Sequence, residues 1–172
     1  MKPSLVAELD VKSLLAALEA CLKQQIHSRR LDNPLMIGIH TGGVWLAENL
    51  HKKLKIKEPL GRLNIAFYRD DFSRIGVHPE VRPSELPSTE DRDIILIDDV
   101  LYTGRTIRAA LNELFDYGRP RQVILGVLID RNGRELPIQA DCVGAHIELA
   151  ANQSIKLTGP DPLRLELHTL PS

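Results

Sequence analysis

Three short segments in the middle of the chain are apolar at almost every position. They are Leu35–Ile39, Ile94–Ile97 and Val123–Ile129. A strand that is covered on both faces by helices shows such a continuous run, whereas a half-exposed strand alternates. Helical patterns separate the three runs. The order of strand, loop and helix therefore predicts an α/β fold, with a parallel sheet and helices on both faces.

The predicted helices have clear apolar faces and recognisable ends. Asp10 can cap a first helix, whose apolar positions follow at helical spacing: Val11, Leu14, Leu15, Leu18, Cys21, Leu22 and Ile26. A second helix is predicted from Val44 to about Leu54. A third is predicted over Thr106–Tyr117, because Gly118 and Pro120 follow it.

Apolar and polar residues alternate in two further segments, and a third segment shows no hydrophobic periodicity. Leu63, Ile65 and Phe67 alternate with more polar residues and predict a half-exposed strand. The leucines at 163, 165 and 167 predict a late strand in the same way. Between them, residues 69–92 are polar, contain three prolines and show no period. A long irregular segment in a compact domain is usually functional or mobile.

Length and composition limit the class of protein. The chain has 172 residues and predicts one domain over 1–172, and its net charge of -1 does not suggest a general nucleic-acid binder. The N-terminus shows no signal peptide and no apolar run reaches membrane-spanning length, so no membrane association is expected. Cys21 and Cys142 are far apart and fit no disulfide framework. They predict two reduced thiols in a cytoplasmic protein.

Polar segments follow each of the three buried runs. They are His40–Gly43, Asp98–Thr106 and Asp130–Glu135. In parallel α/β sheets, ligands bind at the carboxyl ends of the strands. We therefore expect these three segments to gather at one edge of the sheet and to form the binding site.

The stretch ILIDDVLYTGRT, residues 95–106, places two acids before a Thr-Gly-Arg-Thr turn that opens a helix. Backbone N–H groups at a helix start, with the hydroxyls of Thr103 and Thr106, predict a phosphate site, and Gly104 allows close approach. Neither the Walker nor the dinucleotide-binding glycine pattern occurs. Asp98 and Asp99 can accept hydrogen bonds from sugar hydroxyls. The two halves together predict a ribose 5-phosphate ligand, and a divalent cation would offset the repulsion between the acids.

The run from Ile94 to Thr106 resembles the 5-phosphoribosyl 1-diphosphate (PRPP) signature of type I phosphoribosyltransferases. The stretches GRLNIAFYRDD, VLYTGRTIRAALNELFDYGRP and LIDRNGRELPI closely resemble the PyrR family, the pyrimidine operon regulators and uracil phosphoribosyltransferases. The similarity extends from about Leu9 to His146. It implies the type I phosphoribosyltransferase fold: a central, mostly parallel sheet flanked by helices, with a mobile lid loop at about 69–92 and a small base-pocket hood at about 130–172.

The resemblance also implies an activity, the conversion of uracil and PRPP to UMP and diphosphate, and a homodimer or larger oligomer. It assigns roles by position. Asp98 and Asp99 would hold the ribose, and Arg69 in the lid would contact the diphosphate. The 5-phosphate site would be Leu101, Tyr102, Thr103, Gly104, Arg105 and Thr106; the diphosphate site His40, Thr41, Gly42 and Gly43; and the base pocket Asp130, Arg131 and Arg134. Mg²⁺ would be held mainly by PRPP and water, without a dedicated set of protein ligands.

The chain departs from the family pattern at the diphosphate site. The family usually carries a basic residue at position 40 and an arginine at position 42, and this chain has His40 and Gly42. Backbone donors and Thr41 remain, but positive charge is lost. Weaker binding of diphosphate and PRPP than in a typical member is therefore expected.

An alternative function is regulatory, because some members bind pyrimidine-gene leader RNA in response to uridine nucleotides. RNA binding depends on basic surface, and this chain has Gly133, Gln139 and Ala145 where RNA-binding members tend to be basic. Its first helix has Glu19 and Lys23 where Thr and His are usual. These residues argue against RNA binding and leave it as the alternative. A PRPP or UMP sensor with little catalysis, and a transferase for another base, also fit the acid pair and the phosphate turn.

Overall fold

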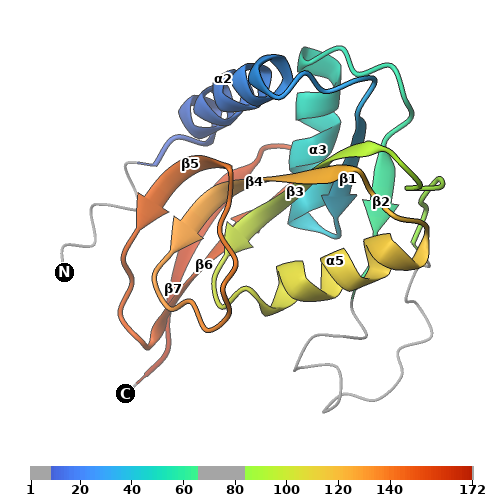
Figure 1. Ribbon diagram of the computed structural model, residues 1–172. Coiled ribbons are helices and arrows are strands. Elements are labelled where there is room, and N and C mark those ends of the chain that lie inside the picture. The colour runs from blue at the N-terminus through green and yellow to red at the C-terminus, as the bar shows by residue number, and fades with distance from the viewer. Residues whose placement is uncertain (1–8, 66–83, 172) are drawn as a thin grey trace.

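Five parallel strands form the central sheet, in the order β2-β1-β3-β4-β5 (Figure 1). The computed structural model describes residues 9–65 and 84–171. The strands are β1 (Leu35–Ile39), β2 (Gly61–Leu63), β3 (Asp93–Leu101), β4 (Gln122–Arg131) and β5 (Cys142–Ile147). The three apolar runs of the sequence are the three inner strands, β1, β3 and β4. Because all five strands are parallel, their carboxyl ends meet at one edge of the sheet.

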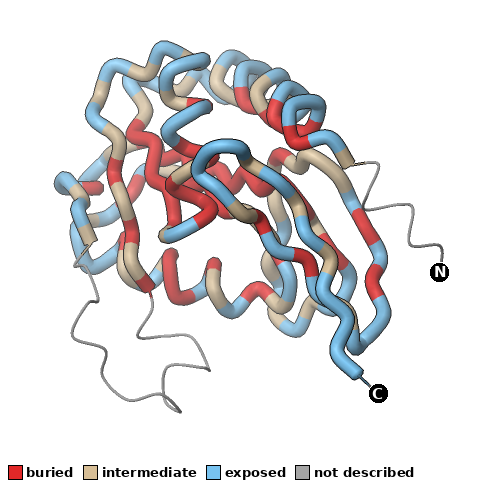
Figure 2. The backbone as a smooth tube through the Cα atoms, turned by 180° about the vertical axis from the view of Figure 1, so that it is seen from behind, coloured by how far each residue is buried: buried red, intermediate tan, exposed pale blue. Residues whose placement is uncertain are grey.

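Helices cover both faces of this sheet, as the sequence predicts. Helices α2 (Val11–Ser28) and α3 (Gly42–Lys53) lie on one face, and α5 (Arg105–Asp116) lies on the other (Figure 1). Strand β3 supplies both cores, because Ile95 and Ile97 pack with α2 and α3, whereas Ile94 and Leu96 pack with α5. Figure 2 shows the buried positions concentrated in the middle of the molecule, where the strands run.

A small antiparallel sheet, β6 (Gln153–Thr158) and β7 (Arg164–Thr169), follows the central sheet in the chain. Ile155 and Leu157 are buried in the same core as α2 and α3, and the alternating leucines of β7 pack against it. The predicted late strand is therefore confirmed. Its partner β6 was not predicted.

Several boundaries differ from the sequence prediction. Helix α3 begins at Gly42, two residues before the predicted start, and β3 continues through the acid pair to Leu101. Strand β2 ends at Leu63, although Ile65 beyond it is still buried. Phe67 lies outside the described residues. Strand β5 was not predicted, because its sequence CVGAHI contains a glycine and an exposed histidine in place of a continuous apolar run.

The patternless segment 69–92 is described only from residue 84 onward. There it forms no helix, but it is attached to its surroundings. Glu85 pairs with Arg62 through two backbone hydrogen bonds of 2.8 and 3.0 Å. Thr89 is fully buried, and its hydroxyl donates to the Leu114 carbonyl at 2.8 Å. Residues 84–92 are thus anchored to β2 and α5, and the rest of the predicted lid lies outside the described residues.

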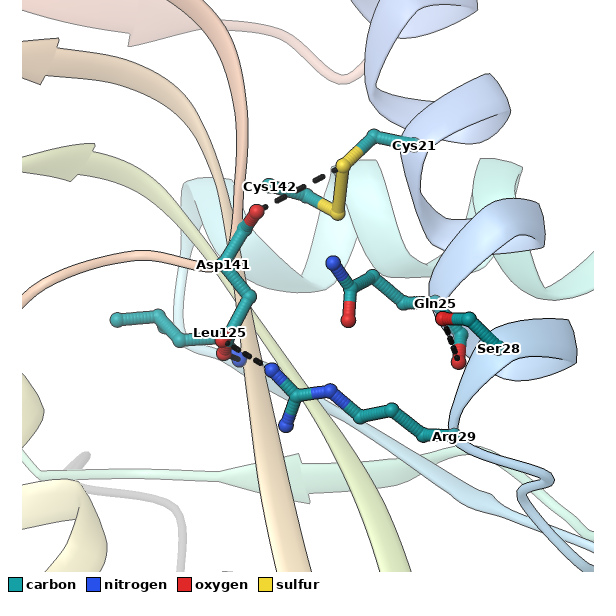
Figure 3. The surroundings of a disulfide bond; sticks show 7 residues. All are labelled: Cys21, Gln25, Ser28, Arg29, Leu125, Asp141 and Cys142. Carbon is teal, nitrogen blue, oxygen red and sulfur yellow. Dashed lines mark hydrogen bonds and ion pairs between the residues drawn. A yellow bond between two sulfur atoms is a disulfide. The ribbon is translucent and has the colours of Figure 1, made fainter.

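The prediction of two reduced cysteines is wrong in this structure, because Cys21 and Cys142 form a disulfide (Figure 3). Helix α2 packs on β5, which brings their Cα atoms to 5.7 Å across a sequence separation of 121 residues. Such a Cα distance is typical of disulfides. Beside the bond, Asp141 accepts hydrogen bonds from Arg29 at 2.7 Å and from the Leu125 N–H at 2.8 Å. The sequence could not reveal this contact, because it did not predict β5.

Candidate functional site

The acid pair lies near the carboxyl end of β3, in the middle of the sheet. Asp98 is 3% exposed and Asp99 is partly exposed. The Asp99 N–H donates to Asp98 Oδ1 at 2.8 Å, and the Val100 N–H donates to Asp99 Oδ1 at 2.8 Å. Each carboxylate thus accepts a backbone hydrogen bond from the residue that follows it. These bonds hold both acids in place and compensate part of the repulsion between them.

The predicted diphosphate segment lies directly beside this pair. Thr41 is the N-cap of α3, and its peptide bond with His40 is cis. Gly42 approaches Asp99 so closely that a Cβ atom at position 42 would overlap Asp99 Oδ2. A Cβ at Gly43 would lie 2.6 Å from the Ile97 carbonyl oxygen, so both glycines permit close packing. The first turn of α3 therefore presents its N-terminal N–H groups next to the acid pair.

The predicted phosphate segment, Leu101–Thr106, connects β3 to α5. Gly104 has a φ of 95° and is the N-cap of α5. This left-handed conformation is one that glycine adopts without strain. Thr103 Oγ1 accepts a hydrogen bond from the Arg105 N–H at 3.2 Å, which leaves its hydroxyl proton to donate elsewhere. The segment is thus a helix N-terminus that follows the acid pair immediately, as the sequence predicts.

The predicted base-pocket acid, Asp130, connects three elements. It lies near the end of β4 and accepts a hydrogen bond of 2.6 Å from Arg134 on its Oδ1. His146 of β5 places Nδ1 3.5 Å from its Oδ2. Arg134 also donates to the carbonyl oxygen of Tyr102 in the phosphate segment. The base-pocket and phosphate segments are therefore in direct contact.

Arg131 is 6% exposed and is engaged by its own surroundings. Its Nη1 donates to the Gln153 carbonyl at 2.9 Å, which connects β4 to β6. Its guanidinium lies 4.0 Å from the centre of the Tyr102 ring, which is within cation–π distance. The contacts of Arg131 thus hold together the small sheet and the phosphate segment.

A hollow of about 440 Å³ opens at the ends of β4 and β5. Its lining residues are Asp130, Arg131, Asn132, Gly133, Arg134, His146, Ile147 and Glu148. The sequence analysis did not single out His146, Asn132 or Glu148. Asn132 holds the hollow together, because its side chain accepts from the Leu149 N–H at 2.8 Å and donates to the Leu149 carbonyl at 3.1 Å. Asn132 lies within the predicted segment Asp130–Glu135, although its partner Leu149 lies beyond β5. His146 and Glu148 carried no sequence signal, because they lie in and directly after the unpredicted β5.

The structure therefore brings the predicted segments His40–Gly43, Leu101–Thr106 and Asp130–Arg134 to one edge of the sheet, beside the acid pair. Arg69 lies outside the described residues. Within residues 9–65 and 84–171, no group of three or more His, Cys, Asp or Glu side chains could hold a metal ion. In the same ranges, no helix has the length and apolar character needed to cross a bilayer.

Comparison with solved structures agrees with this architecture. A hypoxanthine phosphoribosyltransferase from Staphylococcus aureus has a TM-score of 0.62 and 22% sequence identity, covering 81% of this chain and 76% of that chain. A hypoxanthine-guanine phosphoribosyltransferase from Bacillus anthracis has a TM-score of 0.66 and 16% identity, covering 81% of both chains. At these identities the likeness shows the fold alone, and it confirms the predicted phosphoribosyltransferase fold.

Comparison of sequences is more specific. The phosphoribosyl transferase domain model matches residues 9–160. The bifunctional protein PyrR of Nitrosococcus oceani is 59% identical over 162 residues, covering 92% of each chain. PyrR of Pseudomonas fluorescens is 54% identical over 159 residues, covering 92% of this chain and 95% of that protein. With the acid pair, the helix-start phosphate segment and the parallel sheet already in place, these matches show that the chain belongs to the phosphoribosyl transferase domain family and, within it, to the PyrR family.

Proposed function

We propose that this chain joins uracil to the 5-phosphoribosyl group of PRPP, forming UMP and releasing diphosphate. One observation carries the proposal: the acid pair of β3 lies between two helix N-termini, those of α3 and α5. A helix N-terminus favours an anion, and a carboxylate favours a hydroxyl donor. PRPP has a phosphate at one end, a diphosphate at the other and a diol between them. The order of its three groups matches the order of these segments.

In this arrangement each segment acts on a different part of PRPP. Leu101–Thr106 would bind the 5-phosphate, and Asp98 and Asp99 would accept hydrogen bonds from the ribose hydroxyls. The N-terminus of α3, with His40 and Thr41, would bind the diphosphate. The hollow at the ends of β4 and β5 would hold uracil. These roles follow from the order of the segments along the sheet edge.

The reaction breaks the bond between the ribose C1 and the diphosphate oxygen, and it forms a bond from C1 to N1 of uracil. The electron pair of the broken bond leaves with diphosphate, and the N1 proton of uracil must be removed. Positive charge develops on the ribose in the transition state, and the nearby carboxylates stabilise it. Among the described residues no side chain stands out as the base that takes the N1 proton.

A magnesium ion fits the proposed reaction. Mg²⁺ typically binds one or two carboxylates together with substrate phosphates and water, so Asp98 and Asp99 would be the protein oxygens nearest to such an ion. A magnesium ion would supply positive charge for the departing diphosphate. The two acids fit such an ion when PRPP supplies its other ligands.

The test is UMP formation from labelled uracil and PRPP over a Mg²⁺ series, with guanine, hypoxanthine and orotate as competing bases. We expect Mg²⁺-dependent turnover on uracil alone. Removing one charge-stabilising group commonly costs about 10²- to 10³-fold in kcat, so Asp99→Asn should lose at least about 100-fold. Turnover on another base would replace uracil in the proposal. PRPP binding without turnover on any base would support a sensor and contradict the enzyme.

A second candidate function is RNA-binding regulation responsive to uridine nucleotides, because the relatives are named bifunctional. Two described positions weaken this candidate. On α2, Lys23 forms an ion pair of 3.0 Å with Glu19. Gly133 contacts the Tyr102 ring so closely that it leaves no room for a side chain. Binding of pyrimidine-gene leader RNA, measured with and without UMP over a salt series, tests this function. An affinity that neither responds to UMP nor depends on the leader sequence would remove it.

A further inference from the structure

The loop that follows β4 donates hydrogen bonds to two successive carbonyl groups of the phosphate segment, Leu101–Thr106. Arg134 donates to the carbonyl oxygen of Tyr102. The N–H groups of Glu135 and Leu136 donate to the carbonyl oxygen of Thr103, at 3.0 and 3.1 Å. Three donors from one loop therefore bind two neighbouring peptide groups of the other. This contact joins the base side of the site to its phosphate side.

Holding these carbonyls also sets the direction of two N–H groups. In a planar trans peptide, the C=O and the following N–H point in opposite directions. The peptide bonds after Tyr102 and after Thr103 are trans, because the cis bonds of the described chain lie elsewhere. The N–H groups of Thr103 and Gly104 must then point away from Arg134 and its neighbours. Within residues 9–65 and 84–171, neither of them donates to a protein acceptor. They remain as donors at the N-terminus of α5, where an anion is favoured.

Arg134 is well placed for this task because its own position is fixed. Its guanidinium is a planar fork with donors in two directions. One direction is taken by the Tyr102 carbonyl and the other by Asp130 Oδ1, at 2.6 Å. Its side chain is 26% exposed and that of Asp130 is 14% exposed, so water competes only partly for these bonds. The Tyr102 ring is held as well, by the guanidinium of Arg131 and by close contact with Gly133.

We infer that Arg134 is a positioning residue for the transfer reaction. It holds the phosphate segment in the conformation that presents the N–H groups of Thr103 and Gly104 to the 5-phosphate, and it does so without contacting uracil. The inference rests on the proposed role of Leu101–Thr106 in phosphate binding. Its consequence is specific: loss of Arg134 weakens the PRPP side of the site, although the residue lines the hollow proposed for the base.

The experiment compares Arg134→Gln and Arg134→Lys with a matched control, Arg164→Gln. Arg164 is an exposed arginine on β7, outside the proposed site. KM is measured for PRPP at saturating uracil and for uracil at saturating PRPP, and the Kd of ribose 5-phosphate is measured by calorimetry. Melting temperatures of all the proteins are recorded.

For Arg134→Gln we expect KM for PRPP and Kd for ribose 5-phosphate to rise together by about tenfold, the worth of roughly one hydrogen bond to a charged group. KM for uracil should stay within about twofold. Lysine keeps a charged donor but lacks the fork, so Arg134→Lys should fall between Arg134→Gln and the wild type. Arg164→Gln should match the wild type in all three constants.

A rise in KM for uracil with an unchanged Kd for ribose 5-phosphate would overturn the inference and make Arg134 a base contact. An equal rise in KM for PRPP, KM for uracil and Kd for ribose 5-phosphate, together with a fall in melting temperature, would also overturn it. Arg134 would then be only a structural residue. If Arg134→Gln does not fold, Arg134→Lys decides by the same criteria. Failure of the proposed function looks different, because the wild type itself would then form no UMP. The Kd for ribose 5-phosphate tests the inference even in that case.

Discussion

Asp93, at the start of β3, is the buried acid on which stability should depend most clearly. It is fully buried. Arg121 binds both its oxygens, from Nε at 2.9 Å and from Nη2 at 2.5 Å. The side-chain amide of Gln122 donates to it at 3.0 Å and the Asp32 N–H at 2.8 Å. These bonds connect the segment before β1 to the beginnings of β3 and β4, so the carboxylate joins three parts of the chain.

The hydrogen bonds from Arg121 lower the pKa of Asp93 from 3.8 to about 2, against burial, which raises it. Because the folded-state pKa is the lower one, the unfolded chain binds more protons between about pH 4 and pH 2. The ionised carboxylate therefore stabilises the fold above pH 3.8, and this contribution is lost as the pH falls toward 2. At 1.36 kcal/mol for each pKa unit, it is worth about 2 kcal/mol at pH 7 and about 1 kcal/mol at pH 3.

Asp93→Asn should therefore lower the free energy of unfolding by about 2 kcal/mol at pH 7. Urea unfolding of the wild type and the variant at pH 7, 5, 4 and 3 measures the difference. The difference in unfolding free energy between the wild type and the variant should fall by about half between pH 7 and pH 3. The reason is that the wild-type carboxylate becomes protonated and no longer stabilises the fold. Asp161→Asn, at an exposed aspartate in the turn between β6 and β7, is the matched control and should show no such trend. A gap of the same size at every pH would refute the linkage to Asp93.

Two further predictions concern the disulfide and the start of α3. Reduction of the bond between Cys21 and Cys142 should lower the free energy of unfolding by about 2–4 kcal/mol, because it releases a long loop in the unfolded chain. The Cys21→Ser, Cys142→Ser double variant should not respond to reductant, and two free thiols in the native protein before reduction would contradict the bond. Gly42→Ala should displace Asp99 and lower kcat/KM for PRPP on the order of tenfold, since small misplacements in an active site are costly. An unchanged kcat/KM would show that Asp99 can move without consequence.

The sequence predicts the inner strands well and the edge strands poorly, for one physical reason. Strands β1, β3 and β4 are covered on both faces, so nearly every residue is buried and the run is continuous. Strands β2 and β5 lie at the edges of the sheet. Strand β2 has only three residues, and β5 has partly exposed positions and an exposed histidine. A pattern based on burial has little to detect in strands of this kind.

The sequence likewise predicts one part of the site and misses another. Parallel topology alone predicts that segments after the inner strands meet at one edge, and the structure confirms this for His40–Gly43, Asp98–Thr106 and Asp130–Glu135. The pairing of particular atoms depends on the path of each loop. No periodicity could show that Arg134 reaches the Tyr102 carbonyl. The contact between His146 and Asp130 was also out of reach, because β5 was not predicted.

Strand β3 has acids near both ends, and their surroundings differ. At its beginning, Asp93 is enclosed and paired with Arg121, so its charge is fully used within the protein. At its end, Asp99 is partly exposed, accepts a hydrogen bond from the Val100 N–H and has no ion pair with a described lysine or arginine. A partly exposed carboxylate at the carboxyl end of a parallel strand can bind hydroxyl groups or a metal ion. The residue type is the same near both ends of β3. The available partner makes Asp93 structural, whereas Asp99 is the acid that we propose for a ligand.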